Sequence, residues 1–190
     1  VLKVDGKHLP VAKQKSALGY VKASKEGNNM RTFTAEKTSG GTSWGAVYAQ
    51  WMQPVEDVKS ATAGMTVERM FFKDGKRLSS LDHLKVGDRL TVRIVITADR
   101  DYDFVQVADH RAACMEPTLQ LSGYRNGCYV ATKDNASYFY FDVLSKGRHT
   151  VEMTYYIDRA GSYRTGLCTA QCAYSPEFAG RDKSWEVKSE

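Results

Sequence analysis

The residues best suited to chemistry lie close together between Asp99 and Tyr124. Within a few positions this stretch contains Asp109, His110, Cys114 and acidic neighbours. A cysteine next to a histidine can act as a nucleophile, because the histidine accepts the proton of the thiol. His110 and Cys114 are separated by three residues on a chain that we predict to be extended, so their side chains cannot meet without a special turn. The spacing favours a loop histidine beside a structural cysteine, and we predict no catalytic residue here.

No other pattern in the sequence indicates catalysis. Glycine-rich phosphate loops, nucleophile elbows and pairs of carboxylates on one face are missing from the sequence. We therefore predict a protein that is not an enzyme and has no cofactor and no metal site, with a hydrolase as the least favoured alternative. The aromatic residues at 138–141, with Tyr155 and Tyr156, could form a carbohydrate platform. Such alternation is more typical of a sandwich core on one face and cross-strand pairs on the other.

The four cysteines, Cys114, Cys128, Cys168 and Cys172, could form disulfides, remain free buried thiols or bind zinc. Cys168 and Cys172 lie about 13 Å apart on an extended chain, beyond the limit of about 7 Å for a disulfide. We prefer the nested pairing of Cys114 with Cys172 and of Cys128 with Cys168, while the crossed pairing stays open. Disulfides would place the protein outside the cytosol. Zinc is disfavoured, since the sequence has no C-x-x-C knuckle.

The charged residues of this 190-residue chain are dispersed. The net charge is +5, with 27 basic and 22 acidic residues. Basic residues alternate with acids, as in Glu68-Arg69, Asp99-Arg100 and Asp158-Arg159. This pattern predicts a solvated surface of mixed charge and no nucleic-acid partner. No leader pattern follows Val1, and 182–188 resembles a polar tail, so we expect a piece of a larger protein.

Alternation of apolar and polar residues predicts β-strands along most of the chain. It is clearest in 89–98, where Leu90, Val92, Ile94 and Ile96 share one face. We predict an all-β fold, an antiparallel immunoglobulin-like or macroglobulin-like β-sandwich. The small and polar residues 55–64 indicate a linker between two sets of strands. The further expected strands lie at 2–4, 17–23, 30–37, 44–51, 66–73, 103–107, 128–132, 137–143, 148–157 and 163–174, with a turn at 122–124.

Several segments resemble one family of large proteins. The segment 107–117, V-x-D-x-R-A-A-C-M-E-P, resembles the D-x-x-P-A-G-F-E-P segment of the last macroglobulin domain (MG10) of bacterial alpha-2-macroglobulins. The segment 170–177 is similar to that domain's closing E-A-M-Y-x-P-E strand, and 155–163 to its Y-x-x-R-x-x-x-P-G-x-F hairpin. Upstream, 41–50 resembles the closing strands of the CUB-like domain that precedes it. The residues that carry the motifs are Asp109, Arg111, Glu116, Pro117, Tyr174 and Pro176.

Two positions depart from the family's pattern, and its reactive site is missing. Arg111 and Cys114 stand where proline and glycine are usual, and the form seen here is most like the Bacteroidetes branch. The family's thioester motif is Cys-x-Glu-Gln, whereas the stretch 114–117 ends in proline. The resemblance therefore implies a module that lies outside the bait region and the thioester domain.

The resemblance implies a domain plan and a function. Residues 1–54 would be the second half of a CUB-like β domain, 55–64 a linker, and 65–190 the MG10-like sandwich. The whole would be the non-catalytic C-terminal part of an extracytoplasmic protease inhibitor, with scaffold and conformational-relay roles and a membrane anchor outside this chain. The expected partners are its thioester and macroglobulin domains and, through the whole protein, target proteases.

Half of a CUB-like sandwich would leave open strand edges and an uncovered apolar face. Residues 1–54 are thus expected to pack on the sandwich or on a second copy of the chain. The alternative function is a stand-alone extracytoplasmic binding module, of the carbohydrate or adhesin type, that uses exposed tyrosines.

Overall fold

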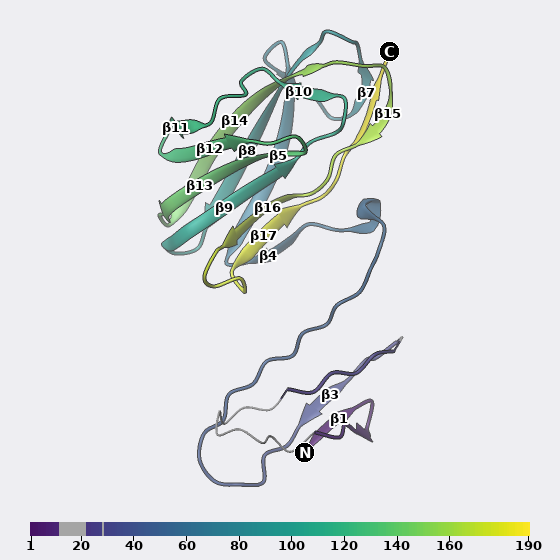
Figure 1. Ribbon diagram of the computed structural model, residues 1–190, viewed down its shortest axis with the longest axis vertical. Helices are drawn as coiled ribbons and strands as arrows, with labels where there is room; N and C mark the ends of the chain where they lie inside the picture. The colour runs from purple at the N-terminus through teal and green to yellow at the C-terminus, as the bar shows by residue number, and fades with distance from the viewer. Residues whose placement is uncertain (12–21, 28) are drawn as a thin grey trace. The chain divides into compact units, whose positions relative to one another are not determined.

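The computed structural model describes residues 1–11, 22–27 and 29–190, and it divides the chain into two compact units (Figure 1). The first unit is Val1–Gln50 and the second is Trp51–Glu190. Among the described residues, no helix is long and apolar enough to cross a membrane. The two units differ strongly in packing.

The first unit contains a small antiparallel sheet of three short strands in the order β2-β1-β3. A tight turn at Asp5-Gly6, with φ values of 48° and 74°, connects the first two strands. The Asp5 carboxylate accepts hydrogen bonds from the backbone N–H groups of Arg31 and Thr32 at 2.9 and 2.8 Å. Among the described residues of this unit, Val4 alone is buried. The strands are β1 (Leu2–Val4), β2 (Lys7–His8) and β3 (Phe33–Ala35).

The predictions for this unit have mixed outcomes. Strands at 2–4 and within 30–37 are confirmed. The strand predicted at 44–51 is wrong, since none of these residues is in a strand, none pairs with a described strand, and Trp44 is 95% exposed. Apolar alternation alone does not make a strand where no neighbouring strand pairs with the backbone. Most of the strand expected at 17–23 lies outside the described residues, and 22–23 are not in a strand.

The second unit is a sandwich of two antiparallel sheets, as the sequence predicted. One sheet has five strands in the order β10-β14-β8-β5-β6, and the other has seven in the order β11-β12-β13-β9-β16-β17-β4. The five-stranded sheet comprises β5 (Met65–Lys73), β6 (Lys76–Arg77), β8 (Arg89–Ala98), β10 (Met115–Pro117) and β14 (Gly147–Ile157). The seven-stranded sheet comprises β4 (Ala61–Ala63), β9 (Tyr102–His110), β11 (Gly123–Arg125), β12 (Cys128–Thr132), β13 (Ala136–Leu144), β16 (Cys168–Cys172) and β17 (Ala179–Asp182).

The hydrophobic core lies between these two sheets. Leu90, Val92 and Ile94 project from β8 and are fully buried, while Val107 and Phe139 are part of the same core from the opposite sheet. The predicted strand at 89–98 has the same limits as β8. Alternation therefore predicted both the position of this strand and the face that it buries.

A third, smaller sheet closes one end of the sandwich and contradicts the predicted polar tail. Asp182 and Val187 are buried, and β18 lies between β15 and β7. The apolar residues Trp185 and Val187 are two apart and suit a strand. The prediction of one strand at 163–174 is also wrong, because β15 and β16 are separate strands of different sheets. The strands of the small sheet are β7 (Leu81–Leu84), β15 (Gly161–Arg164) and β18 (Glu186–Ser189).

Two segments expected to be irregular belong to the sandwich. The predicted linker 55–64 contains the 3₁₀ turn η1 (Val55–Asp57) and the strand β4, which pairs with β17. The turn predicted at 122–124 is replaced by β11, and the tight turn lies at Asn126-Gly127 instead, where φ is 49° and 82°. Asn-Gly in a two-residue hairpin favours these left-handed values, so the sequence already carried this signal.

Candidate functional site

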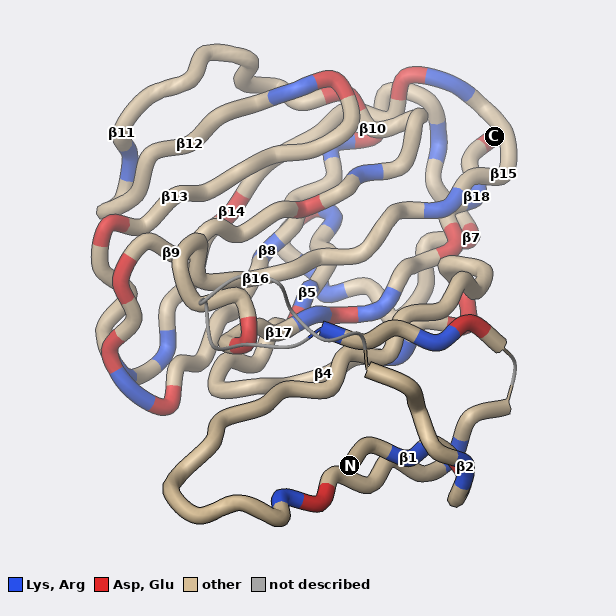
Figure 2. The backbone as a smooth tube through the Cα atoms, turned by 60° about the horizontal axis from the view of Figure 1, so that its bottom comes forward, with Lys and Arg blue, Asp and Glu red and all other residues tan. Residues whose placement is uncertain are grey.

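The most unusual side chain of the sandwich is Arg69, in β5 between the two sheets. Met65, Val67 and Phe71 are buried along the same strand, and the two-residue period of a strand places Arg69 in phase with them. Arg69 is 2% exposed. The expectation that Glu68-Arg69 forms part of a solvated surface is therefore wrong for the arginine. Elsewhere, basic and acidic residues are interspersed along the chain, as expected (Figure 2).

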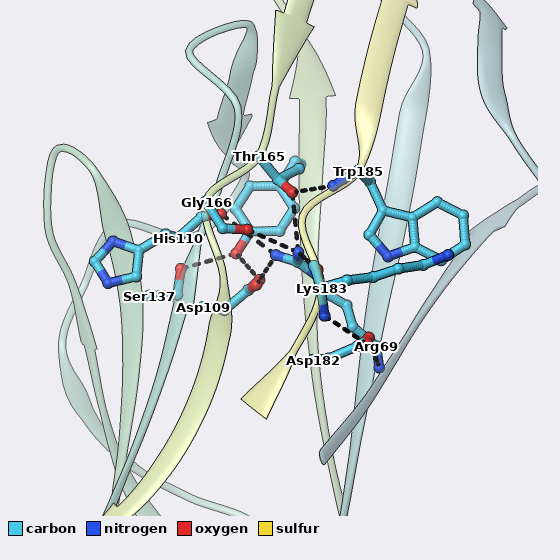
Figure 3. A network of polar contacts seen from close by, with 10 residues as sticks. Arg69, Asp109, His110, Ser137, Thr165, Gly166, Asp182, Lys183 and Trp185 are labelled. Carbon is cyan, nitrogen blue, oxygen red and sulfur yellow. Dashed lines mark hydrogen bonds and ion pairs between the residues drawn. The ribbon is translucent and has the colours of Figure 1, made fainter. Parts of the chain in front are cut away.

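The guanidinium group of Arg69 reaches segments that are far apart in the sequence (Figure 3). Its Nη1 donates to Oδ1 of Asp109 at 2.7 Å, an ion pair in which each side chain is 1% exposed. Its Nη2 donates to Oγ1 of Thr165 at 2.9 Å and to the carbonyl oxygens of Gly166 and Lys183 at 2.9 and 2.8 Å. One side chain thus connects β5 to β9, to the β15–β16 connection and to the β17–β18 connection.

The backbone of Arg69 is held by a second carboxylate. The N–H of Arg69 donates to Oδ2 of Asp182 at 2.9 Å. The other oxygen of Asp182 accepts from the hydroxyl of Ser60 at 2.9 Å and from the N–H of Lys183 at 2.8 Å. We call Arg69, Asp109, Thr165 and Asp182 the arginine clasp. Ser60 lies in the predicted linker, so the clasp also anchors that segment to the sandwich.

A buried tyrosine completes the surroundings of Asp109. The hydroxyl of Tyr155, on β14, lies 2.9 Å from the hydroxyl of Ser137 and donates to Oδ2 of Asp109 at 3.5 Å. Burial, followed by the negative charge of Asp109, raises the pKa of Tyr155 well above its usual value. The phenol therefore keeps its proton and remains a hydrogen-bond donor to the carboxylate.

This arrangement can stabilise charge, but its polar groups are not accessible to a substrate. Arg69 and Asp109 are 2% and 1% exposed, and polar groups of the protein occupy Nη1 and Nη2 of the guanidinium group. Removing one partner of such a buried pair leaves an uncompensated charge and costs about 3–5 kcal/mol. Arg69 lies in the five-stranded sheet and Asp109 in the seven-stranded sheet, so the pair joins the two layers. The clasp is a structural site.

The structure contradicts the preferred disulfide pairing. All four cysteines are buried free thiols. Cys128 lies in β12, whereas Cys168 and Cys172 lie in β16, with β13 and β9 between them. Three strand spacings amount to about 14 Å, twice the reach of a disulfide. Neither the nested nor the crossed set of pairs can form, and the free buried thiols, our second interpretation, describe the fold.

The motif residues predicted from the family resemblance do not gather at one site. Asp109 belongs to the clasp, and Pro117 is buried opposite Tyr155 in the ladder between β10 and β14. Arg111 donates from Nη2 to the carbonyl oxygen of Asp134 at 2.7 Å. These three residues therefore shape β9, β10 and the loop between them.

The other three motif residues are exposed. Glu116 accepts a hydrogen bond from Gln120 at 3.1 Å. Tyr174 is 82% exposed and packs edge to face on Phe104, with 5.3 Å between the ring centroids. The carbonyl oxygen of Pro176 accepts from Nε2 of Gln171 at 3.0 Å. These contacts are local and do not create a reactive site.

Sequence reasoning missed Arg69, Thr165 and Asp182 as members of the clasp. A signal for Arg69 was present, because it stands two residues from Val67 and from Phe71, at an inward position of a predicted strand. Asp109 likewise continues the inward series of Val105 and Val107. Two opposite charges at inward positions of two strands indicate a buried pair. Thr165 and Asp182 carried no comparable signal, since both belong to segments whose partners are distant in the sequence.

Comparisons with known proteins agree with this fold. Residues 64–177, more than half of the chain, match the family model described as the bacterial alpha-2-macroglobulin MG10 domain. No curated protein matches the sequence.

Solved structures of alpha-2-macroglobulins from two bacteria are similar to the sandwich. Salmonella alpha-2-macroglobulin reacted with methylamine has a TM-score of 0.64 and 18% identity, over 72% of this chain and 10% of that one. The native conformation of the Escherichia coli protein has a TM-score of 0.64 and 16% identity, over 73% and 10%. A fragment of that protein from domain MG7 to the C-terminus has 0.62 and 17%, over 72% and 25%. The chain thus spans between a tenth and a quarter of these relatives.

Proposed function

Because the chain belongs to the bacterial alpha-2-macroglobulin family through its MG10 domain, we propose that it is a non-catalytic module of a large protease inhibitor. Its role is that of a scaffold that relays conformational change between domains. The observation that carries this proposal is the ion pair of Arg69 with Asp109, which joins the two sheets inside the core. A relay must move as one body, and a buried ion pair between layers resists sliding of one sheet over the other.

The partners of this module are the thioester and macroglobulin domains of the same full-length protein. Target proteases meet it only through the whole protein. The proposed location is extracytoplasmic, with a membrane anchor outside these residues. Since the four cysteines are free thiols, this location is supported by family membership alone and not by disulfides.

Residues 1–54 are proposed to be the second half of a CUB-like domain. The exposure of apolar side chains in this segment supports the proposal, as with Trp44 at 95% and Tyr48 at 86%. The missing cover would come from the first half of that domain, from the sandwich or from a second copy of the chain. Light scattering combined with limited proteolysis tests the proposal. A monomer whose residues 1–50 resist proteolysis without any interface to the sandwich would contradict it.

The relay role is tested in the full-length protein with the variant Asp109→Asn. We expect trypsin bound by the wild type to keep its activity on a small peptide and to lose it on a large protein substrate. Asp109→Asn leaves Arg69 without its counter-charge, so the two sheets loosen and protection against the large substrate decreases. The matched control is Glu152→Gln, which alters an ion pair whose partners are 44–45% exposed. If Asp109→Asn lowers the melting temperature but leaves inhibition intact, the module is not a relay.

A second candidate function is a carbohydrate-binding or adhesin-type module. It is favoured by a row of outward tyrosines on the seven-stranded sheet, Tyr124, Tyr129 and Tyr140, which are 37–73% exposed. Their ring centroids lie 5.2 and 6.5 Å apart in succession, while Phe139 and Phe141 face the core. A glycan array with wild type and Tyr129→Ala tests this candidate. Binding that survives the substitution would count against a platform of tyrosines.

A further inference from the structure

One strand of the five-stranded sheet has an unoccupied edge. β14 pairs with β8 along nearly its whole length, but on its other side β10 pairs only with Tyr155–Ile157. The N–H of Thr118 then bonds the carbonyl oxygen of Thr154 at 3.0 Å, and the ladder ends there. Within the described residues, no strand pairs with 148–153 on this side.

The register of β14 identifies which backbone groups are free. The N–H of Ile157 donates to the carbonyl oxygen of Asp88, and its C=O accepts from the N–H of Gly87. Both partners lie on the β8 side, so the backbone groups of the odd-numbered residues of β14 point toward β8. The carbonyl of Thr154 points to the β10 side, so the backbone groups of the even-numbered residues of β14 point away from β8. In an antiparallel ladder both groups of one residue point to the same side. The N–H and C=O groups of Arg148, Thr150 and Glu152 therefore point outward from the free edge.

The opposite sheet extends beyond this edge. β13 is followed by β12 and β11 (Figure 1). Residues of β12 and β14 together line a cavity of about 210 Å³. It is half open, and its volume is of the same order as the roughly 150 Å³ of an enclosed cavity that holds one small apolar group. Charged groups stand at its mouth, where Arg125 and Glu152 contribute to the lining. The other lining residues are Leu119, Asn126, Cys128, Val130, Phe139, Val151 and Met153.

We propose that this edge binds an extended segment of a partner polypeptide as an additional strand beside β14. The backbone of the segment pairs with Arg148, Thr150 and Glu152, and one of its apolar side chains enters the cavity. The charge of Glu152 is balanced by its ion pair with Arg93. Arg125 in the cavity lining and Arg148 on β14 form no ion pair among the described residues, so they leave positive charge near the edge. The segment that fits is therefore uncharged and apolar at alternate positions, with acidic residues at its ends.

The overhanging strands oppose antiparallel pairing of this edge with a second copy of the sandwich. Antiparallel pairing of two β14 edges would need a two-fold axis perpendicular to the five-stranded sheet. Such an axis would place both seven-stranded sheets on the same side, so β11 and β12 of one copy would collide with those of the other. A sheet edge that cannot pair with the sheet of another molecule protects a protein from aggregation. A single flexible strand meets no such obstacle.

Cys128 provides a direct test, since it is a free thiol that lines the cavity. The probe is a synthetic peptide, Asp-Thr-Val-Thr-Cys-Thr-Val-Asp, whose cysteine is joined by a disulfide bond to a small thiol. The thiolate of Cys128 attacks the peptide's cysteine sulfur, so a protein–peptide disulfide forms, the original disulfide breaks and the small thiol leaves. We expect it to exchange with Cys128, as identified by mass spectrometry, in preference to Cys114, Cys168 and Cys172. A control peptide with proline in place of each flanking threonine lacks backbone donors and should react at least about tenfold more slowly. Equal rates for the two peptides would overturn the proposal.

Hydrogen exchange provides a second measurement that does not depend on the thiol rate. In the free protein, the amides of Arg148, Thr150 and Glu152 should exchange faster than those of their odd-numbered neighbours. In the peptide adduct they should become protected. Thr150→Pro removes the central donor from the open side and should abolish both protection and selective capture, while Thr150→Val preserves both. An adduct without protection, or protection that increases with protein concentration in the absence of peptide, would contradict a single bound strand.

Discussion

The two units of this chain contain similar sequence patterns, but they differ in how many of their side chains are buried. In 44–51 apolar residues alternate much as they do in β8, yet Trp44 is 95% exposed and Ile94 is fully buried. The difference lies in their neighbours. β8 has strands on both sides and a second sheet above it, whereas 44–51 pairs with no strand among the described residues. Alternation therefore indicates the capacity to form a strand, and a partner surface decides whether the strand exists.

Energy accounts for this contrast. Burial of apolar area contributes roughly 25 cal/mol per Å², and a sheet needs three or more strands with a covered face to be stable in water. The sandwich meets this condition with two sheets and the arginine clasp between them. The first unit has three short strands and, among its described residues, one buried side chain. Its stability should therefore be low and should depend on cover from elsewhere.

The largest expected effect comes from breaking the clasp in the stable unit. Asp109→Ala leaves Arg69 charged and buried, and we expect a loss of about 3–5 kcal/mol in the free energy of unfolding, measured with urea. Glu152→Ala, at an exposed ion pair, should cost no more than about 1 kcal/mol. Equal costs for the two variants would mean that the buried ion pair stabilises the fold no more than the exposed one.

A smaller loss is expected where two strands of the sandwich approach closely. A Cβ atom on Gly180, in β17, would collide with the backbone carbonyl of Met65. Gly180→Ala should therefore destabilise the unit by about 1–3 kcal/mol, because a backbone group cannot move aside like a flexible side chain. Gly123→Ala is the control, since nothing lies within 4 Å of its added carbon. Thermal unfolding of both variants would compare the two sites.

Acid should weaken both units through different carboxylates. Burial raises the pKa of Asp88, but hydrogen bonds from Lys73 and the Lys85 amide outweigh it and lower the pKa below 3.8. Backbone N–H groups of Arg31 and Thr32 lower the pKa of Asp5 in the first unit. Both carboxylates then support folding fully at neutral pH, and their contributions are lost as the pH falls below about 4.

An NMR titration of the carboxyl carbons measures both groups in one experiment. Asp88→Asn should flatten the decline in the stability of the sandwich at low pH without changing the signals of Asp5. A midpoint for either carboxyl at or above 3.8 would contradict the expectation.

The smallest effect is expected for an aromatic residue of the first unit. Trp44→Ala should change the free energy of unfolding by no more than about 0.5 kcal/mol, because its side chain is almost entirely exposed. Phe139→Ala, at 1% exposure in the sandwich, should cost about 3–5 kcal/mol. Both variants are measured in this chain without the first half of the CUB-like domain. A large loss for Trp44→Ala would then mean that the sandwich or a second copy covers this segment.

Most of the sandwich was predictable, and most of its polar centre was not. The limits of β8 and β12 follow from local alternation, and the family resemblance identified Asp109. The role of Asp109 could not be read from its segment, because its partner Arg69 lies forty residues earlier. The tail predicted at 182–188 failed for a related reason. Asp182 is polar in the sequence but buried in the fold, where the Arg69 N–H and the Ser60 hydroxyl satisfy it.

By itself, the sequence determined which segments can be strands, which faces they bury and which family the chain resembles. The first two properties depend on residues two or three positions apart, and the third depends on short motifs. Only the tertiary structure decided which strands are neighbours. Strand order separates Cys128 from Cys168 and Cys172 and brings Arg69 to Asp109. Among the described residues it also leaves 148–153 of β14 without a strand on one side. Contacts between distant residues depend on how all the strands pack at once, and no local pattern encodes that order.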